Sequence, residues 1–147
     1  MITSEMLHRN RCFAALSEEC RQQVAKIAEE KTFLAGERLG YEHDPARYLY
    51  VIVEGEVDLH YLLGNGEQRT VDHLTDGDLL GWSALVEPYR ITGIATAAMD
   101  TRVVAIEADK LRDLCEQDPA LGRCLMAQIV KLLARRLVGA RMQLADC

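Results

Sequence analysis

Short β-type runs separated by turn residues fill the middle of the chain, and this spacing is the feature that most constrains its fold. From Lys31 to Ile106, runs rich in Val, Ile and Tyr alternate with turns such as Gly64–Gly66 and Thr75–Asp78. Gly, Asn and Asp tolerate the backbone angles that tight turns require. Many short strands with turn signals about every 8–12 residues predict a sandwich, a jelly roll or a barrel.

Helical patterns flank this β-rich region on both sides. On the N-terminal side Ser17 is placed as a helix cap, followed by Glu18 and Glu19, which the helix dipole favours in a first turn. A chain of 147 residues is expected to form one domain. We predict a mainly β, α+β chain with an N-terminal helical part over 12–30, a β-roll over 31–107 and C-terminal helices over 109–147.

The long C-terminal helix is predicted to have two apolar faces. Asp118 is its expected cap, and Pro119 takes the first position, where a missing N–H costs nothing. The face expected to pack on the roll contains Leu121, Leu125, Ile129 and Leu132. The other face has the spacing of a coiled-coil seam and contains Met126, Val130, Leu133, Leu137, Ala140 and Leu144. Two stripes favour a parallel homodimer over a helix buried by its own roll.

The charge of the chain argues against a protein that coats nucleic acid. Its formal net charge is −6, whereas neutralising phosphates requires a basic balance or a dense basic stripe. The basic cluster of Lys131, Arg135, Arg136 and Arg141 is interpreted as a solvated helix face. There is no secretory signal and no apolar run near the ~20 residues of a membrane span. These features predict a cytoplasmic protein without a nucleic-acid or membrane partner.

The cysteines do not form a recognisable framework. They are odd in number, with no CxxC pair, and Cys20, Cys115 and Cys124 lie in helical patterns, where cysteine behaves as a small apolar residue. The sequence therefore predicts a reducing compartment and no disulfide framework. Neither the cysteine nor the histidine spacing matches a zinc site.

Candidates for catalysis are few. A metal enzyme of the cupin type would need several histidines and a carboxylate inside the roll. His60 and His73 lie on candidate strands and are placed to face each other across a hairpin, where a surface cross-strand pair is the simpler interpretation. Ser83 and Cys115 have no adjacent base that would activate a nucleophile. We predict neither a catalytic site nor a metal site.

Four segments of the chain, taken together, are typical of one family. They are a tight turn at Phe33–Glu37, a strand–glycine–strand unit at Leu49–Val57, a turn at Asp76–Gly81 and a closing strand at Thr101–Ile106. In this combination the chain resembles the cyclic nucleotide-binding domain family, and within it the sensory halves of bacterial catabolite-activator-type regulators. The resemblance implies an eight-stranded, jelly-roll-like β-barrel between an N-terminal helix and a long C-terminal helix.

The resemblance also implies a ligand site and its residues. The family holds a cyclic phosphate with backbone N–H groups of a short turn and an arginine, and a glutamate accepts from the ribose. The implied ligand is therefore cyclic AMP or cyclic GMP, with no certain cofactor. Transferred to this sequence, the ligand-contacting positions are Gly81, Trp82, Ser83, Ala84, Arg90, Thr92 and Arg141.

Several of these positions depart from the family pattern. Trp82 occupies the glutamate position and cannot accept a bond from a ribose hydroxyl. The arginine position falls on Ile91, and a one-residue shift along a strand would turn Arg90 to the other face unless it lies in a loop. On the long helix, Ala140 cannot bond a base edge, whereas Arg141 can bond or stack on one. These departures predict weak or atypical ligand binding.

Three functions follow as alternatives. The first is a stand-alone, non-catalytic sensor or regulatory domain for a nucleotide or another small anionic ligand, with no DNA-binding domain after its long helix. The second is a ligand-free module for an unidentified protein partner, in which Trp82 and Ile91 fill the pocket. Trp82 would be a stacking wall in the first and a space filler in the second. A cupin-like metal enzyme is the third.

Overall fold

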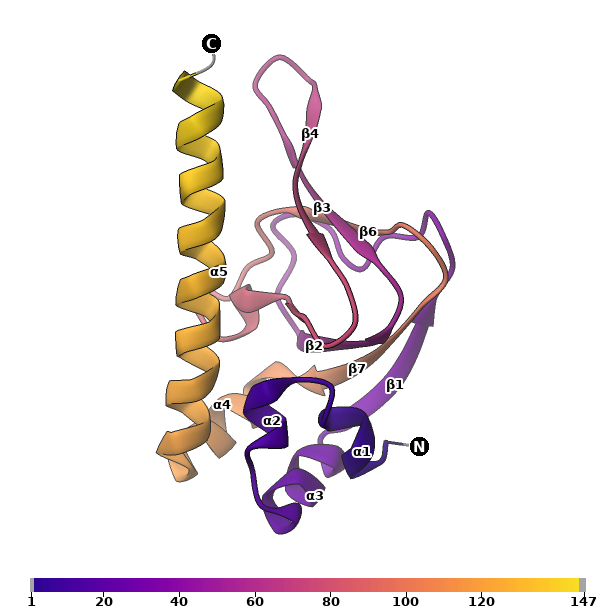
Figure 1. Ribbon diagram of the computed structural model, residues 1–147, viewed down its shortest axis with the longest axis vertical. Coiled ribbons are helices and arrows are strands. Elements are labelled where there is room, and N and C mark those ends of the chain that lie inside the picture. The colour runs from indigo at the N-terminus through magenta and orange to yellow at the C-terminus, as the bar shows by residue number, and fades with distance from the viewer. Residues whose placement is uncertain (1, 146–147) are drawn as a thin grey trace.

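Helices gather at one end of the molecule and continue along one side of a β-roll. The computed structural model describes residues 2–145, and the side chains of residues 2–141. Three short helices form the base: α1 (Ser4–Leu7), α2 (Arg11–Ala14) and α3 (Glu18–Lys26). After the roll come α4 (Ala108–Gln117) and the long α5 (Pro119–Ala145), which runs past both the base and the roll (Figure 1).

Seven strands within the described residues form two antiparallel sheets. One sheet has the order β1-β7-β2-β5 and the other β4-β3-β6. The strand bounds are β1 Ala28–Phe33, β2 Tyr48–Glu54, β3 Val57–Leu62, β4 Gln68–Leu74, β5 Leu79–Leu80, β6 Ile94–Ala97 and β7 Thr101–Glu107. Strands far apart in the sequence are neighbours, such as β1 and β7, as the winding of a jelly roll requires.

The predicted fold class is confirmed: a mainly β roll with helices before it and a long helix after it. The eighth strand is reduced to isolated bridges, which join Arg38 to Thr96 and Pro45 to Arg90. Gly40 lies in the same segment as Pro45. Proline lacks the N–H that a ladder needs, and glycine weakens a strand, so this segment forms an irregular loop instead.

The first strand begins earlier than the helical pattern predicts. The sequence assigns residues 28–30 to the N-terminal helix, but α3 ends at Lys26 and β1 begins at Ala28. Ala28 pairs with Ile106 of β7, and the pairing continues along β1 to Phe33 and Thr101. The ladder with β7 therefore overrides the local helical spacing, because strand formation depends strongly on the neighbouring strand.

Two apolar clusters alternate along the central strands. Leu49 and Val51 of β2 pack with the helices, whereas Ile52 faces the second sheet. On β7, Val104 packs with the helices and Val103 faces the second sheet. Successive side chains of a strand point to opposite faces, so the four-stranded sheet is covered by helices on one face and by β3, β4 and β6 on the other.

Helix α5 has the two faces that its sequence predicts. Asp118 caps it, with Oδ1 accepting from the Leu121 N–H at 3.2 Å. Of the roll-facing stripe, Leu121, Leu125 and Ile129 are buried and Leu132 is partly buried. Of the second stripe, Met126, Val130, Leu137 and Ala140 are exposed, Leu133 is partly buried, and the Leu144 side chain lies outside the described residues.

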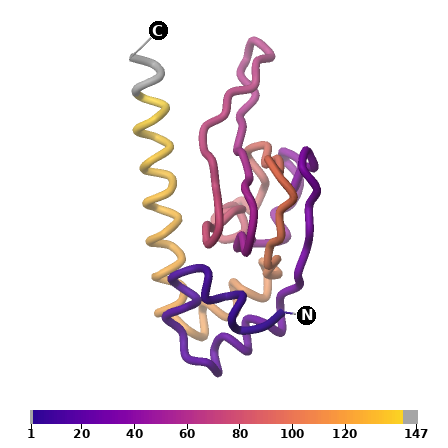
Figure 2. The backbone as a smooth tube through the Cα atoms, turned by 45° about the vertical axis from the view of Figure 1, so that its right-hand side comes forward, coloured from indigo at the N-terminus to yellow at the C-terminus, as the bar shows by residue number. Residues whose placement is uncertain are grey.

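The C-terminal half of α5 extends alongside the β3–β4 hairpin rather than across the roll, as Figures 1 and 2 both show. This leaves its second stripe uncovered along much of its length. None of the helices in residues 2–145 combines the length and apolar character that crossing a membrane requires.

A disulfide joins the helical base to α5. Cys12 of α2 and Cys124 of α5 are bonded, with their Cα atoms 5.7 Å apart. The expectation of no disulfide is therefore wrong. Helical spacing predicts that Cys124 lies on an apolar face, but it does not include Cys12 and does not show which two helices meet. Beside the disulfide, Asn10 and Gln128 exchange two hydrogen bonds of 3.0 and 3.1 Å, which join the same two segments.

A tight corner between β2 and β3 depends on Gly55, as the strand–glycine–strand pattern predicts. Its φ is +133°, a conformation that residues with a side chain rarely adopt. A Cβ at this position would lie 2.7 Å from the Cα of Thr101. Thr101 is 1% exposed and its hydroxyl donates to Glu56 O at 3.1 Å, so it has little room to move.

Gly55→Ala is therefore expected to lower the free energy of unfolding by about 2–4 kcal/mol, from backbone strain and overpacking together. The matched control is Gly66→Ala, since Gly66 also has a positive φ, +87°, but a Cβ there would have nothing within 4 Å. We expect the control to lose only about 1 kcal/mol. Urea unfolding followed by circular dichroism measures both, and equal losses would contradict the proposed contact with Thr101.

Candidate functional site

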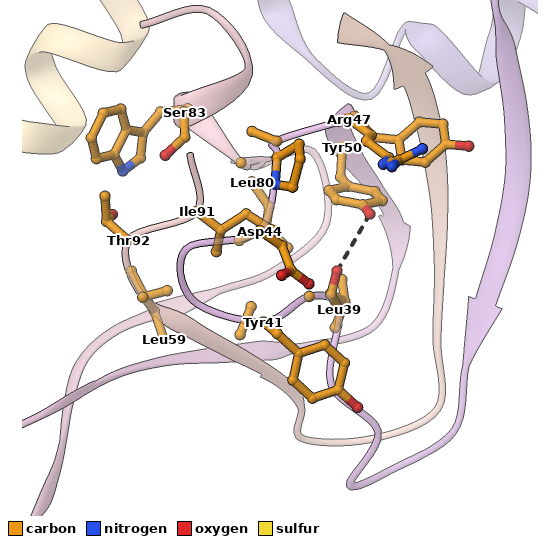
Figure 3. Close-up of a pocket in the computed structure, with 18 of the residues that line it drawn as sticks. Leu39, Tyr41, Asp44, Arg47, Tyr50, Leu59, Leu80, Ser83, Ile91 and Thr92 are labelled. Atoms are coloured by element: carbon orange, nitrogen blue, oxygen red, sulfur yellow. Dashed lines mark hydrogen bonds between the residues drawn. The ribbon is translucent and has the colours of Figure 1, made fainter. Parts of the chain in front are cut away.

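A pocket of about 410 Å³ lies between the roll and helix α5. Its wall is formed by the loop before β2, by strands β2 and β3, by the turn after β5, by the loop before β6 and by α5 (Figure 3). This volume is in the range of small-molecule sites. The pocket is therefore large enough for a ligand of nucleotide size.

The turn after β5 approaches the neighbouring strand closely. Gly81 has a φ of +89°, and a Cβ there would lie 3.0 Å from Tyr48 O. The short helical turn η1 (Trp82–Ala84) follows, closed by a 2.9 Å hydrogen bond from the Ala84 N–H to Gly81 O. The preceding N–H groups, of Trp82 and Ser83, have no acceptor within the turn. They can donate to an anion beside it.

Four of the seven residues that the family resemblance implies line this pocket: Gly81, Trp82, Ser83 and Thr92. Ser83 and Thr92 lie on the same side of the pocket in Figure 3, near the ribbon of α5. Ala84 does not line the pocket, because its side chain is fully buried in the core. Its carbonyl accepts a hydrogen bond of 2.7 Å from Arg112.

The structure does not place Arg90 in the pocket. Arg90 does lie in a loop, which the sequence left open, but its side chain is exposed and its Nη1 donates to His43 O at 3.4 Å. Ile91 lines the pocket instead, at the centre of the view in Figure 3. The loop before β6 therefore brings an apolar side chain where the resemblance implies an arginine.

Arg141 is also absent from the pocket wall; it is exposed on α5. The residue that α5 contributes is Arg136, which the sequence analysis assigned to a solvated face. That interpretation is wrong for Arg136, whose side chain is only 8% exposed. A signal for it existed in the sequence: Arg136 follows Leu132 by four positions, so it continues the roll-facing stripe.

Arg136 is held by a carboxylate of the roll. Its Nε donates to Oδ2 of Asp72 on β4 at 3.1 Å, and Arg135 Nη2 donates to the same oxygen at 2.7 Å. Burial alone would raise the pKa of Asp72, but the hydrogen bonds from the two arginines outweigh it and hold the pKa below its ordinary value. Asp72 therefore stays ionised and ties α5 to β4.

Trp82 separates two hollows. It lines the main pocket and also a second one between the N-terminal segment Arg9–Arg11 and α5. Its side chain is partly buried against the core of the helical base. Trp82 and Ile91 together leave the main pocket open, so they form its wall rather than fill it.

The other side of the pocket is aromatic, with polar groups at its rim. Tyr41, Tyr48 and Tyr50 line this side, whereas Tyr61 lies beside Gly93, next to Thr92. Burial, with smaller effects of Tyr48 and Glu29, raises the pKa of Tyr50 to about 12, so its hydroxyl stays protonated and donates to Leu39 O at 3.4 Å. Asp44 and Arg47 are exposed lining residues, and Figure 3 shows both away from Ser83.

The two strand histidines do not face each other. His60 lies opposite Thr70, and its Nδ1 is 3.0 Å from the threonine hydroxyl. His73 lies opposite Asp58, and hydrogen bonds to Asp58 and to Glu56 raise its pKa. The ladder begins with Val57 opposite Leu74, which places His73 opposite Asp58 rather than His60, and the bulge between Leu59 and His60 then shifts His60 to Thr70; alternation alone does not reveal this register. In residues 2–145, no three His, Cys, Asp or Glu side chains converge as metal ligands.

Comparison with known families agrees with this geometry. The model of the cyclic nucleotide-binding domain matches residues 30–118, which is more than half of the chain. The chain belongs to this family. A solved structure of a protein described as cyclic nucleotide-binding, from Geobacter metallireducens, is 36% identical with a TM-score of 0.79, covering 93% of this chain and 99% of that one.

Two curated relatives are bacterial regulators. The CRP-like cAMP-activated global transcriptional regulator of Mycobacterium tuberculosis is 25% identical over 142 residues, or 97% of this chain and 62% of that protein. The cyclic AMP receptor protein of Thermus thermophilus is 28% identical over 132 residues, or 90% of this chain and 59% of that protein. The chain thus spans about 60% of the length of both relatives.

These relatives correct the expectation of no nucleic-acid partner. One of them is named a transcriptional regulator, and the described chain corresponds to only part of it. The net charge of −6 belongs to this part alone. This charge therefore does not exclude a nucleic-acid partner. The prediction of no such partner, which rested on the charge and on the end of the sequence, is wrong.

The link between α5 and β4 predicts a pH dependence. Because the pKa of Asp72 is lower in the folded chain than in the unfolded one, its stabilising effect is present above the ordinary carboxyl pKa of about 3.9 and is lost as the pH falls through the folded value. At pH 7, Asp72→Asn is expected to lower the free energy of unfolding by about 1–3 kcal/mol. The difference from wild type should narrow below about pH 4.

Urea unfolding between pH 7 and pH 3 measures this difference. Asp76→Asn is a suitable comparison, because the Asp76 carboxylate accepts from a backbone N–H, that of Gly55 at 3.0 Å, rather than from an arginine. If the difference in free energy of unfolding between wild type and Asp72→Asn stays constant over this pH range, the ion-pair account is contradicted.

Proposed function

We propose that this chain is a non-catalytic sensory domain that binds a small anionic ligand of the cyclic-nucleotide class in the pocket beside α5. The observation that carries the proposal is the open pocket of about 410 Å³ with η1, Thr92 and Arg136 on its wall, in a member of this family. Backbone N–H groups, a hydroxyl and a guanidinium are the donors that a phosphate group accepts from.

The openness of the pocket favours a sensor over a ligand-free module. In the module, Trp82 and Ile91 would occupy the space of the ligand, but here they line it. An aromatic ring at the wall can stack on a base or a sugar. We therefore assign Trp82 to a stacking wall.

A non-catalytic role agrees with the chemistry of Cys115, a candidate nucleophile on α4 that does not line the pocket. Burial, with a smaller effect of Asp118, raises the pKa of the Cys115 thiol to about 11, so it remains protonated and a poor nucleophile at neutral pH. The two curated relatives reported above are named for regulation and for cyclic AMP reception. Both observations support signalling rather than turnover.

We also propose that the exposed stripe of α5 packs against a second copy of the chain. Val130 and Leu137 are 63% and 64% exposed, and Met126 is 39% exposed. These residues follow the alternating spacing of a coiled-coil seam, so the same stripe on a second copy is complementary to them.

Isothermal calorimetry with cyclic AMP and cyclic GMP tests the ligand class. We expect one of them to bind, but more weakly than at a site with a loop arginine, because Asp72 already occupies part of the Arg136 guanidinium and a charge-assisted bond is worth about 1.5–3 kcal/mol. Trp82 fluorescence should change on titration, because the ring lines the pocket. If neither nucleotide shows measurable binding at millimolar concentration, this proposal is overturned.

Leu137→Arg tests the second surface. A charge in the seam should shift the chain from dimer to monomer in sedimentation, with the circular dichroism spectrum unchanged, because Leu137 is exposed within one copy. Val138→Arg is the control, since Val138 is also exposed (54%) but lies one position after Leu137 and so about 100° around the helix, outside the seam. If Leu137→Arg stays dimeric, the interface lies elsewhere.

A further inference from the structure

Two arginines share one carboxylate at the edge of the pocket. Arg135 and Arg136 both donate to Oδ2 of Asp72, which leaves an excess of one positive charge at this point. The side chains of Arg136 and Asp72 are 8% and 11% exposed. Arg135 is 62% exposed, so water screens its charge, whereas the nearly buried charge of Arg136 is screened little and attracts an anion in the pocket more strongly than a surface arginine would.

Part of the Arg136 guanidinium has no partner. A guanidinium presents five N–H donors, and donors that are buried in proteins are almost always paired. The Nε of Arg136 is paired with Asp72, but its Nη1 is buried and no group in the described part of the chain accepts from it. Arg136 lines the main pocket, so an acceptor that enters the pocket can complete this set of bonds.

The other cations near the pocket are in the wrong place for this role. Arg90 is exposed and directed to His43 O. Arg47 is exposed and lies on the side of the pocket away from Ser83 and Thr92 in Figure 3. Among the lining residues, Arg136 is therefore the buried cation.

We propose that Arg136 binds the phosphate group of the ligand directly from helix α5, in the place of a cation from the loop before β6. This inference rests on the proposed function of the pocket and assigns its charge-recognising residue. The N–H groups of η1 and the hydroxyl of Thr92 supply further donors, which suits a phosphate with its several acceptor oxygens better than a carboxylate. Asp44, at the rim, is left to accept from a hydroxyl or amino group of the ligand.

The same arrangement makes the ligand and Asp72 competitors for Arg136. Asp72 holds one edge of the guanidinium, and a phosphate in the pocket would repel the Asp72 carboxylate while it attracts Arg136. Ligand binding therefore acts on the contact between α5 and β4. This gives the variants of Asp72 and Arg136 opposite expected effects on affinity.

Calorimetric titration of the full chain with cyclic AMP tests the assignment. Arg136→Gln is expected to weaken binding by about 10–100-fold, the usual effect of losing a charge-assisted bond. Arg135→Gln is the matched control: it also removes an arginine from Asp72, but Arg135 does not line the main pocket, so its affinity should stay within about threefold of wild type. Asp72→Asn should bind cyclic AMP more tightly than wild type.

A second probe separates this inference from the proposed function. Inorganic phosphate, compared with chloride at equal ionic strength, should raise the Tm of wild type and of Arg135→Gln but not of Arg136→Gln. If wild type binds cyclic AMP and Arg136→Gln binds it equally well, the assignment is wrong and the proposed function stands. If wild type binds neither cyclic nucleotide, the proposed function fails and the phosphate result alone decides the role of Arg136.

If Arg136→Gln does not fold, the variants Arg136→Lys and Asp72→Asn still test the assignment. Arg136→Lys retains the charge but loses the forked geometry, so it should bind cyclic AMP more weakly than wild type. Asp72→Asn changes affinity in the other direction, which damage to the fold would not do. Weaker binding by Asp72→Asn, or wild-type binding by Arg136→Lys, would overturn the assignment.

Discussion

The packing of one face of α5 against the base of the molecule determines much of what lies around it. Leu121, Leu125 and Ile129 are at most 2% exposed, and burial of each such side chain stabilises the fold by about 1.5–3 kcal/mol. The Cys12–Cys124 disulfide and the Asn10–Gln128 pair hold the same half of the helix. Since a helix is a stiff rod, fixing its first half also sets the position of its second half beside the roll.

That second half brings charge to the pocket. Arg136 reaches the wall from α5, and Asp72 on β4 partly neutralises it there. In the proposed function the ligand would contact η1 on the roll and Arg136 on the helix, so its affinity would depend on how the two are placed. A ligand shifts a conformational equilibrium only through such differential contacts. If the exposed stripe of α5 packs against a second copy, the same helix would contact both the ligand and the partner copy.

The general arrangement follows from the sequence because it rests on local signals. Asp118 and Pro119 place the start of α5, Gly55 places a corner, and the turn signals separate the strands. The site is less predictable. The resemblance brings Gly81 and Thr92 to the pocket but also implies Arg90, which a loop conformation directs to solvent. The basic cluster on α5 predicts a solvated face for Arg136 when only its charge is considered, although its spacing from Leu132 continues the roll-facing stripe, and no local pattern shows that Asp72 of a distant strand pairs with it.

The sequence by itself determined the type of fold, since strand alternation, helix caps and glycine turns act over a few residues. Only the tertiary structure decided which elements meet. It extended β1 to Ala28 by pairing it with β7, joined Cys12 to Cys124 and left the pocket open beside Trp82. It also placed Arg136 against Asp72, 64 residues earlier in the chain. These contacts depend on long-range packing and on burial, which change the environment of a side chain without leaving a local pattern.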